Sequence, residues 1–173
     1  MYYNKLHPVF RAFMNLNEIA LELLCNEKIG EFNEFRLRNI IFRPNLSGKN
    51  FSNKDLSNAF LNGAICIKTD FSKSDLTKTN LVQAELNESD FEFADLTQAL
   101  FMYADMKNCR ITNCTLKQTN FMWTDLQGSD LRSSTLEDTI FIASYLNNAK
   151  LDNLNKEKAF TKYAKLDNTV WTT

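Results

Sequence analysis

The stretch FMWTDLQGSDL, residues 121–131, carries a large apolar residue at every fifth position, beginning with Phe121. Small residues keep the same spacing, because Thr124 and Ser129 each stand two places before a large apolar residue. A period of five fits neither an α-helix nor a β-strand, whose side chains repeat every 3.6 and 2.0 residues. The Met-Trp pair at 122–123 lies outside this pattern and needs an explanation of its own.

The period of five extends well beyond this stretch, from Leu46 to Leu151. All 22 residues at this spacing are Leu, Phe, Cys, Met or Ile. The whole chain is 44% apolar, and at that content chance gives such a run with a probability of about 10⁻⁸. The position two places earlier is always Ala, Ser, Thr or Cys across residues 59–149, and the position directly before is often Asp or Asn. The repeating unit is therefore small, Asp or Asn, large, polar, polar.

This unit resembles the A(D/N)LXX motif of the pentapeptide-repeat family, and the resemblance covers residues 44–153 without a break in frame. It implies an all-β solenoid: a right-handed quadrilateral β-helix with four repeats in each coil. The large residue and the small one two places before it would point into the tube, where close packing leaves no room for a bulkier pair. The Asp or Asn can bond its own turn backbone, which accounts for turns in a chain with only four glycines.

The two ends of the repeat region are expected to be covered, since an open stack of coils exposes unpaired backbone. Residues 1–43 are predicted to form an N-terminal α-helical cap and a lead-in strand, with a helix over residues 9–27 and the strand over residues 31–43. The apolar spacing of the first segment is helical. The pattern fails after residue 153, so residues 154–173 are predicted to form a loop or short helix and then a last partial coil.

Four repeats in each coil place residues twenty apart on the same side of the tube. The residue number therefore predicts on which of the four sides each outward side chain lies. One side collects outward apolar residues and explains the Met-Trp pair. We expect this side to bind a protein partner or a second copy of the chain, unless the N-terminal helix folds back over it. Its residues are Phe60, Val82, Leu100, Met102, Tyr103, Met122, Trp123, Ile140 and Ile142.

Acidic columns form a second candidate surface. Some pentapeptide-repeat proteins bind DNA gyrase by imitating the shape and charge of duplex DNA, which would need a strongly negative rod. Lys and Arg residues interrupt the columns here, and the acids occupy the turn position of the repeat, so we interpret most of them as turn residues. The columns contain Glu85, Asp90, Asp95, Asp105 and Asp125.

The sequence contains no recognisable catalytic motif. His7 is the only histidine and has no identifiable partner, while Cys66, Cys109 and Cys114 occupy inward positions of the repeat and are interpreted as core residues. There is no glycine-rich phosphate loop and no spacing typical of metal ligands. We therefore expect no enzyme activity, no metal and no cofactor.

The net charge of −1 gives no reason to expect direct binding of nucleic acid. No apolar run is long enough to span a membrane, no standard signal peptide is visible, and the four cysteines form no CxxC pair. These features predict a cytoplasmic protein, or one secreted into a host cell if it is an effector.

The function predicted from these features is a non-enzymatic protein-binding scaffold that uses its apolar β-helix face. The resemblance suggests a bacterial effector, or the targeting or substrate-recognition module of one. Two alternatives remain: a DNA-mimicking binder of DNA gyrase or topoisomerase, of the quinolone-resistance kind, and the β-helix fragment of a bacterial effector ubiquitin ligase.

Overall fold

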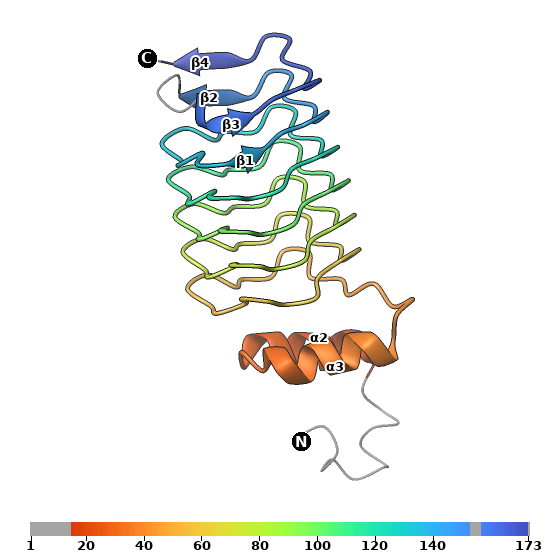
Figure 1. Cartoon of the computed structure of the whole chain (residues 1–173). Coiled ribbons are helices and arrows are strands. Elements are labelled where there is room, and N and C mark those ends of the chain that lie inside the picture. Colours follow the sequence, from red (N-terminus) through yellow and green to blue (C-terminus); the bar gives the residue numbers. More distant parts are fainter. Residues whose placement is uncertain (1–14, 153–156, 173) are drawn as a thin grey trace, which may run out of the picture.

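The computed structural model describes residues 15–152 and 157–172. The chain winds into a tube of stacked coils (Figure 1), in which parallel bridges join residues twenty apart, beginning with Asn45 and Ile65. A turn follows every fifth residue, so each coil has four sides. This arrangement is a β-helix solenoid, as the repeat predicts.

Most coils contribute only one bridging residue to each side, so regular strands appear mainly near the C-terminal end. There β1 (Thr139–Ile140) pairs in parallel with β3 (Ala159–Phe160), and β2 (Lys150–Asp152) pairs in parallel with β4 (Val170–Thr172). Both pairs keep the offset of twenty residues. The register of the coils therefore continues to the last described residues.

Each corner of the tube is a tight turn whose third residue has a positive φ. The amide of Lys54 donates to the carbonyl of Phe51 at 3.2 Å, and Asn53 between them has a φ of 60°. The Asp or Asn of the repeat supports the following corner, as when Asp55 Oδ1 accepts from the amide of Ser57 at 2.9 Å. This bond is the predicted contact between the acid and its own turn, and it favours turns that lack glycine.

The large residues of the repeat fill the tube and are buried along its length. Phenylalanines stack in two columns on opposite sides of the tube, displaced along its axis so that most of them face a smaller residue. This alternation fills the interior without overpacking it. The columns are Phe51, Phe71 and Phe91, with ring centroids 5.7 and 5.2 Å apart, and Phe101, Phe121 and Phe141, with centroids 5.0 and 5.2 Å apart.

The small positions also link neighbouring coils by hydrogen bonds. Thr124 Oγ1 donates to the carbonyl of Phe101 at 2.6 Å, and Ser129 Oγ donates to the carbonyl of Met106 at the same distance. A hydroxyl at these positions is therefore both small enough for the interior and satisfied there.

Two helices, α2 (Leu16–Cys25) and α3 (Ile29–Arg38), lie across the N-terminal end of the tube (Figure 1). Asn15 begins α2 with a capping box, in which its side chain and that of Glu18 each accept from the backbone amide of the other residue. α2 thus lies within the helix predicted for residues 9–27, and residues 9–14 of that prediction lie outside the described residues.

The lead-in strand that we predicted for residues 31–43 is wrong, because α3 occupies most of this segment. Phe32 and Phe35 are both buried, and their spacing of three residues places them on one face of a helix. A strand would have sent them to opposite faces. Residues 40–42 belong to the connection that follows α3.

Side chains of the two helices replace the backbone of a missing coil. Asn33 Nδ2 donates to the carbonyl of Asn58 at 2.9 Å, and its Oδ1 accepts from the amide of Phe60 at 2.8 Å. Asn17 binds both backbone groups of Asn45 in the same way, at 2.9 and 2.7 Å. Each carboxamide therefore satisfies one donor and one acceptor of the open edge.

Arg36 completes this closure from α3. Its Nε donates to the carbonyl of Phe60 at 3.0 Å, its Nη2 donates to the carbonyl of Asn62 at 2.7 Å, and its Nη1 donates to the carbonyl of Phe42. The guanidinium is buried, and these carbonyls give its charge the partners that burial requires.

Within residues 154–173, predicted to form a loop or short helix and then a last partial coil, the coil resumes at Ala159, where β3 begins. Phe141 donates its amide to the carbonyl of Phe160 at 2.8 Å, a contact of the regular coil. Lys156, whose polarity had indicated a break, lies outside the described residues. Thr161 occupies an inward position of the final coil and is only partly buried.

Candidate protein-binding surface

The nine apolar residues predicted to share a face do lie on one side of the tube. Bridges connect Phe60 through the coils to Leu100 and Ile140, and the amide of Trp123 donates to the carbonyl of Ile142 at 3.2 Å. We call eight of them the apolar strip: Val82, Leu100, Met102, Tyr103, Met122, Trp123, Ile140 and Ile142. Phe60 lies on the same side but beside α3, where Asn33 and Arg36 hold its backbone.

The most exposed members of the apolar strip are Tyr103 and Trp123, which are 58% and 49% exposed. Their rings stack with centroids 6.4 Å apart and planes inclined by 4°. Both residues stand at a corner with a φ of 61°, a value close to that of the other corners of the tube. The positive φ therefore belongs to the repeat, and it does not explain why these two corners carry aromatic residues.

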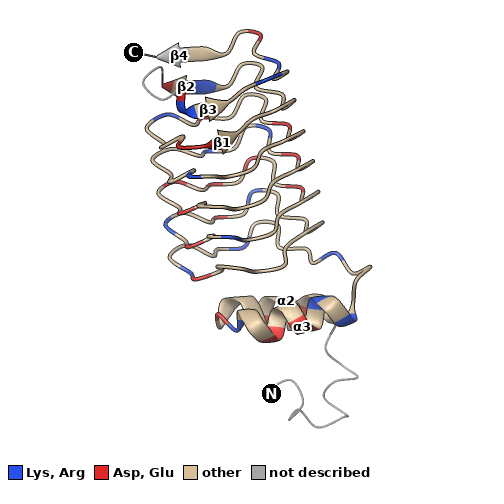
Figure 2. Cartoon of the chain, viewed as in Figure 1, with Lys and Arg blue, Asp and Glu red and all other residues tan. Residues whose placement is uncertain are grey.

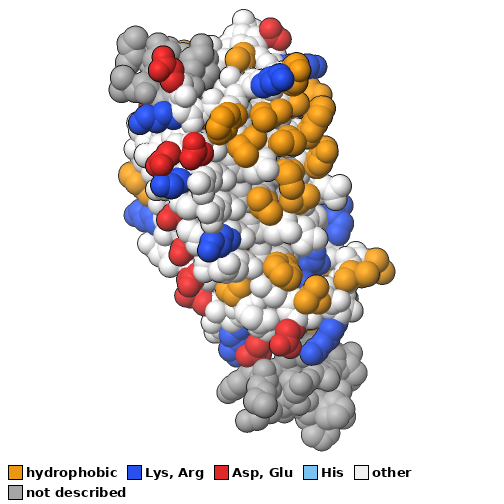
Figure 3. Space-filling view, viewed as in Figure 1, with side chains coloured by type: hydrophobic (Ala, Val, Ile, Leu, Met, Phe, Trp, Pro, Cys, Tyr) orange, Lys and Arg blue, Asp and Glu red, His pale blue; other side chains and the backbone are white. Residues whose placement is uncertain are grey.

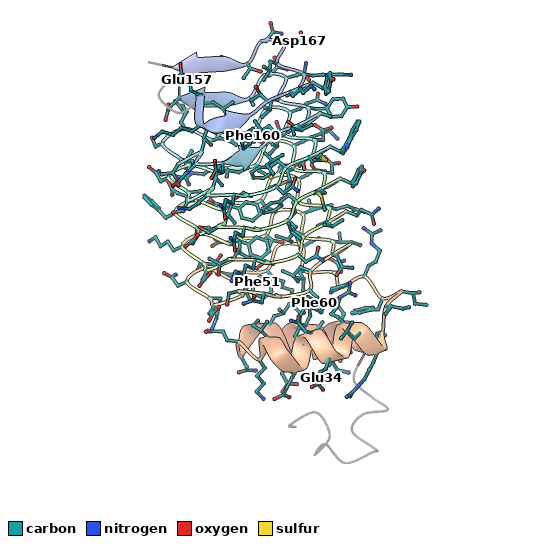
Figure 4. The ribbon with its side chains drawn as sticks, viewed as in Figure 1. Glu34, Phe51, Phe60, Glu157, Phe160 and Asp167 are labelled. Carbon is teal, nitrogen blue, oxygen red and sulfur yellow. The ribbon has the colours of Figure 1, made fainter. Side chains whose placement is uncertain are left out.

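The other members of the apolar strip are half-buried and form a floor beside the stacked rings. The same side continues into the last coil with the exposed side chains of Phe160 and Tyr163. Figure 3 shows hydrophobic side chains gathered in one band along the tube, whereas the rest of the visible surface is mainly polar with scattered charges. Figure 4 labels Phe60 beside α3 and Phe160 near the opposite end.

Neither α2 nor α3 covers the apolar strip. Both helices lie across the end of the tube, with their polar side chains bonded to the first coil (Figure 1). The sequence left open that the N-terminal helix folds back along this side, but α2 lies across the end of the tube instead (Figure 1). Residues 1–14 lie outside the described chain.

A hollow of about 400 Å³ borders the apolar strip at its N-terminal end. The connection after α3 forms one wall, where Ile40 and Ile41 are 76% and 92% exposed. Gly63 and Gln83 line the side that belongs to the tube, and the amide of Gly63 bonds to the carbonyl of Val82, a member of the strip. Sequence reasoning missed this hollow because it treated residues 31–43 as a strand.

Lys and Arg side chains form ion pairs with the acidic columns along much of their length. Arg43 Nη2 lies 2.7 Å from Glu85 Oε1, and Lys107 Nζ lies 3.0 Å from Asp105 and 3.1 Å from Asp125. Hydrogen bonds to these two carboxylates raise the pKa of Lys107. Figure 2 shows the same mixture of signs along the coils.

The two remaining acids of the prediction also have partners. Asp90 lies 3.5 Å from Arg110, which also pairs with Glu92, and Asp95 Oδ1 accepts from the amide of Thr97 at 2.9 Å. The described surface therefore does not form a continuous negative rod.

The three inward cysteines lie in the interior, as the repeat predicts. Burial raises the pKa of Cys66 above its usual range, and it raises the pKa of Cys109 and Cys114 to about 12 each. A thiol held protonated in this way is a poor nucleophile. Among the described residues, no group of His, Cys, Asp and Glu side chains could hold a metal ion, and no helix is long and apolar enough to cross a membrane.

The sequence matches a family described as pentapeptide repeats (8 copies), over residues 64–101, 79–118 and 119–155. No curated protein matches the chain. Among solved structures, a pentapeptide repeat protein from the thylakoid lumen of Arabidopsis thaliana is similar at 24% identity, with a TM-score of 0.43, covering 55% of this chain and 66% of that protein.

Two further solved structures are similar to the chain. HetL, a pentapeptide repeat protein involved in heterocyst differentiation regulation in the cyanobacterium Nostoc, is 20% identical, covers 75% of this chain and 77% of its own, and has a TM-score of 0.28. QnrB1, a plasmid-mediated fluoroquinolone resistance protein, is 13% identical, covers 76% and 84%, and has a TM-score of 0.42. The family match spans more than half of the sequence and agrees with the coils of twenty residues, so the chain belongs to the pentapeptide-repeat family.

Proposed function

We propose that this protein is a non-enzymatic scaffold that binds a protein partner through the apolar strip. The observation that carries the proposal is the stacked pair of Tyr103 and Trp123, which are half-exposed beside the other apolar residues of the same side. Two exposed rings in contact within a contiguous apolar surface are typical of a binding site.

The composition of the strip supports the same function. Aromatic residues and methionine are enriched in protein interfaces, and most binding energy comes from a few aromatic or arginine residues. Here Met102 and Met122 flank the aromatic pair and belong to the same two coils. A single exposed apolar residue would need no explanation, but a contiguous group on one side of a rigid tube does.

The wider setting of this function is a hypothesis that rests on the family resemblance. We propose a bacterial effector, or the recognition module of one, such as the β-helix segment of an effector ubiquitin ligase. The acidic columns give the DNA-mimic alternative little support, because Arg43, Lys107 and Arg110 neutralise them.

The proposal is tested by placing a photo-crosslinking amino acid at position 123 or 102 and irradiating cells that express the protein. Position 93 is the matched control, because Phe93 is 54% exposed, has a φ of 61° and lies on the opposite side of the tube. We expect covalent protein adducts from positions 123 and 102 and none from position 93. Equal adducts from all three positions, or none from 123 and 102, would refute the proposal.

A double variant, Trp123→Ala with Met102→Ser, separates binding from folding. It should lose the adducts formed through a crosslinker at position 142 while its thermal unfolding stays close to that of the parent. Unfolding of the double variant would show that these side chains serve internal packing.

A further inference from the structure

We infer that the partner presents one amphipathic α-helix, which lies along the tube axis on the apolar strip. This inference rests on the proposed function, because it requires that the strip bind protein. It adds the secondary structure of the partner and the direction of docking.

The backbone of the strip excludes an added β-strand. Along this side the backbone groups bond to the coils above and below, as when the amide of Phe101 donates to the carbonyl of Asn120 at 2.8 Å and the amide of Tyr103 donates to the carbonyl of Met122 at 3.2 Å. An extended peptide laid on the strip would find no free edge and would lose the hydration of its own backbone. A helix already satisfies its backbone, so it can cover an apolar surface through side chains alone.

The dimensions of the side match one helix. From the hollow at Gly63 to Tyr163 the side spans five coil steps, which is about 24 Å at the usual strand spacing. The outward residues of each side cover about 10 Å, which is the diameter of an α-helix. A helix of about 16 residues has the same length, and its apolar stripe would contact the strip while its polar face remained in water.

The exposed aromatic rings set the scale of the docking surface. Tyr103, Trp123 and Phe160 are about half-exposed and Tyr163 is 75% exposed, so the four rings together offer roughly 350–600 Å². Whether a second copy of this chain occupies the surface instead is decided by the light-scattering arm of the test below.

The chemistry of the strip also suits a helix with an apolar stripe. Between Val82 and Ile142 the outward residues of this side carry no charge, so an apolar stripe docked there would bury no unpaired ion. At the C-terminal end of the side Lys162 Nζ lies 4.9 Å from the ring centroid of Tyr163, so the helix should present a polar or acidic residue at that end. Met102 and Met122 can adjust their side chains to the bulky residues of such a stripe. The hollow at the other end is lined by Arg36, Arg43, Asn62 and Gln83 as well as by Ile40 and Ile41, so it would accept a polar end of the helix.

Selection from a phage library of random 16-residue peptides tests the inference. The full chain serves as bait, and the double variant Trp123→Ala with Met102→Ser removes peptides that bind elsewhere. We expect recovered peptides to carry apolar residues at positions i, i+3 or i+4, and i+7, and to become helical on binding by circular dichroism. Trp123→Ala should lower the affinity for these peptides at least tenfold, whereas Phe93→Ala should change that affinity less than twofold.

Other results would overturn the inference in distinguishable ways. Peptides that depend on Trp123 but alternate apolar and polar residues would reject the helix and leave the proposed function intact. Recovery of no peptide that depends on Trp123 would reject the helix, and the crosslinking at position 123 would then decide the proposed function alone. A dimer in light scattering that Trp123→Ala dissociates would identify a second copy as the occupant. Competition by a synthetic peptide of residues 1–14 that binds the strip would identify the chain's own N-terminal segment.

Discussion

Phe121 and Trp123 are two residues apart, yet the square coil gives them opposite roles. Phe121 is 0% exposed, and its ring centroid lies 5.0 Å from that of Phe101 and 5.2 Å from that of Phe141. Replacing it with alanine removes the middle ring of this column and opens a cavity in a closely packed interior. Such Phe→Ala changes cost about 3–5 kcal/mol, and the stacked neighbours favour the upper half of that range.

Trp123→Ala is the matched comparison and should cost about 1–2 kcal/mol. The ring is half-exposed and stacks on Tyr103, so only part of its surface is buried and its removal leaves no closed cavity. Alanine keeps the positive φ of this corner and releases no strain. The difference between the two variants should therefore be at least about 2 kcal/mol in the free energy of unfolding.

Urea unfolding followed by far-ultraviolet circular dichroism measures both values, with equal m-values as the condition for comparison. A Phe121→Ala variant that loses less than about 1 kcal/mol would contradict the filled interior. A Trp123→Ala variant that loses as much as Phe121→Ala would show that Trp123 belongs to the core, and the apolar strip would lose its central residue.

Four further outcomes follow from single contacts. Arg36→Met leaves three backbone carbonyls without their donor and should cost about 3 kcal/mol or more in urea unfolding. Thr124→Val removes a buried hydrogen bond of 2.6 Å and should cost about 1 kcal/mol in the same assay. In the native protein only Cys25 is exposed, so Ellman's reagent should titrate one thiol before denaturation and four afterwards; rapid reaction of a second thiol would contradict the burial of the others. The hydrogen bond from Arg132 holds the pKa of Asp130 below its ordinary value of 3.8. The stability that this ion pair gives the fold is therefore complete above pH 3.8 and is lost as the pH falls through the lowered pKa. Arg132→Ala should raise the pKa of Asp130 in an NMR titration.

The sequence predicts the tube and the sides of its surface because both follow from one short period. A repeat of five with one large and one small inward residue determines the coil. The offset of twenty residues then assigns Met102 and Trp123 to one side. No long-range contact has to be guessed, since each coil contacts only its neighbours.

The rest depends on contacts that the period does not encode. Residues 31–43 lie outside the repeat and were predicted as a strand, whereas α3 occupies most of them. The bonds of Asn33 and Arg36 to the first coil could not be foreseen, because they join a helix outside the repeat to backbone groups inside it.

The pairing of the acidic columns was missed for a similar reason. Lys107 bridges Asp105 and Asp125 only because a long side chain reaches both coils. Counting charges along the sequence gives their balance but not their partners.

The most direct test is the dissociation constant of the partner captured at position 123, measured for the parent, Trp123→Ala and Phe93→Ala. If the apolar strip is the recognition surface, Trp123→Ala should weaken binding at least tenfold, or about 1.4 kcal/mol, while Phe93→Ala should leave it within a factor of about two. Equal affinities for all three proteins would contradict the account.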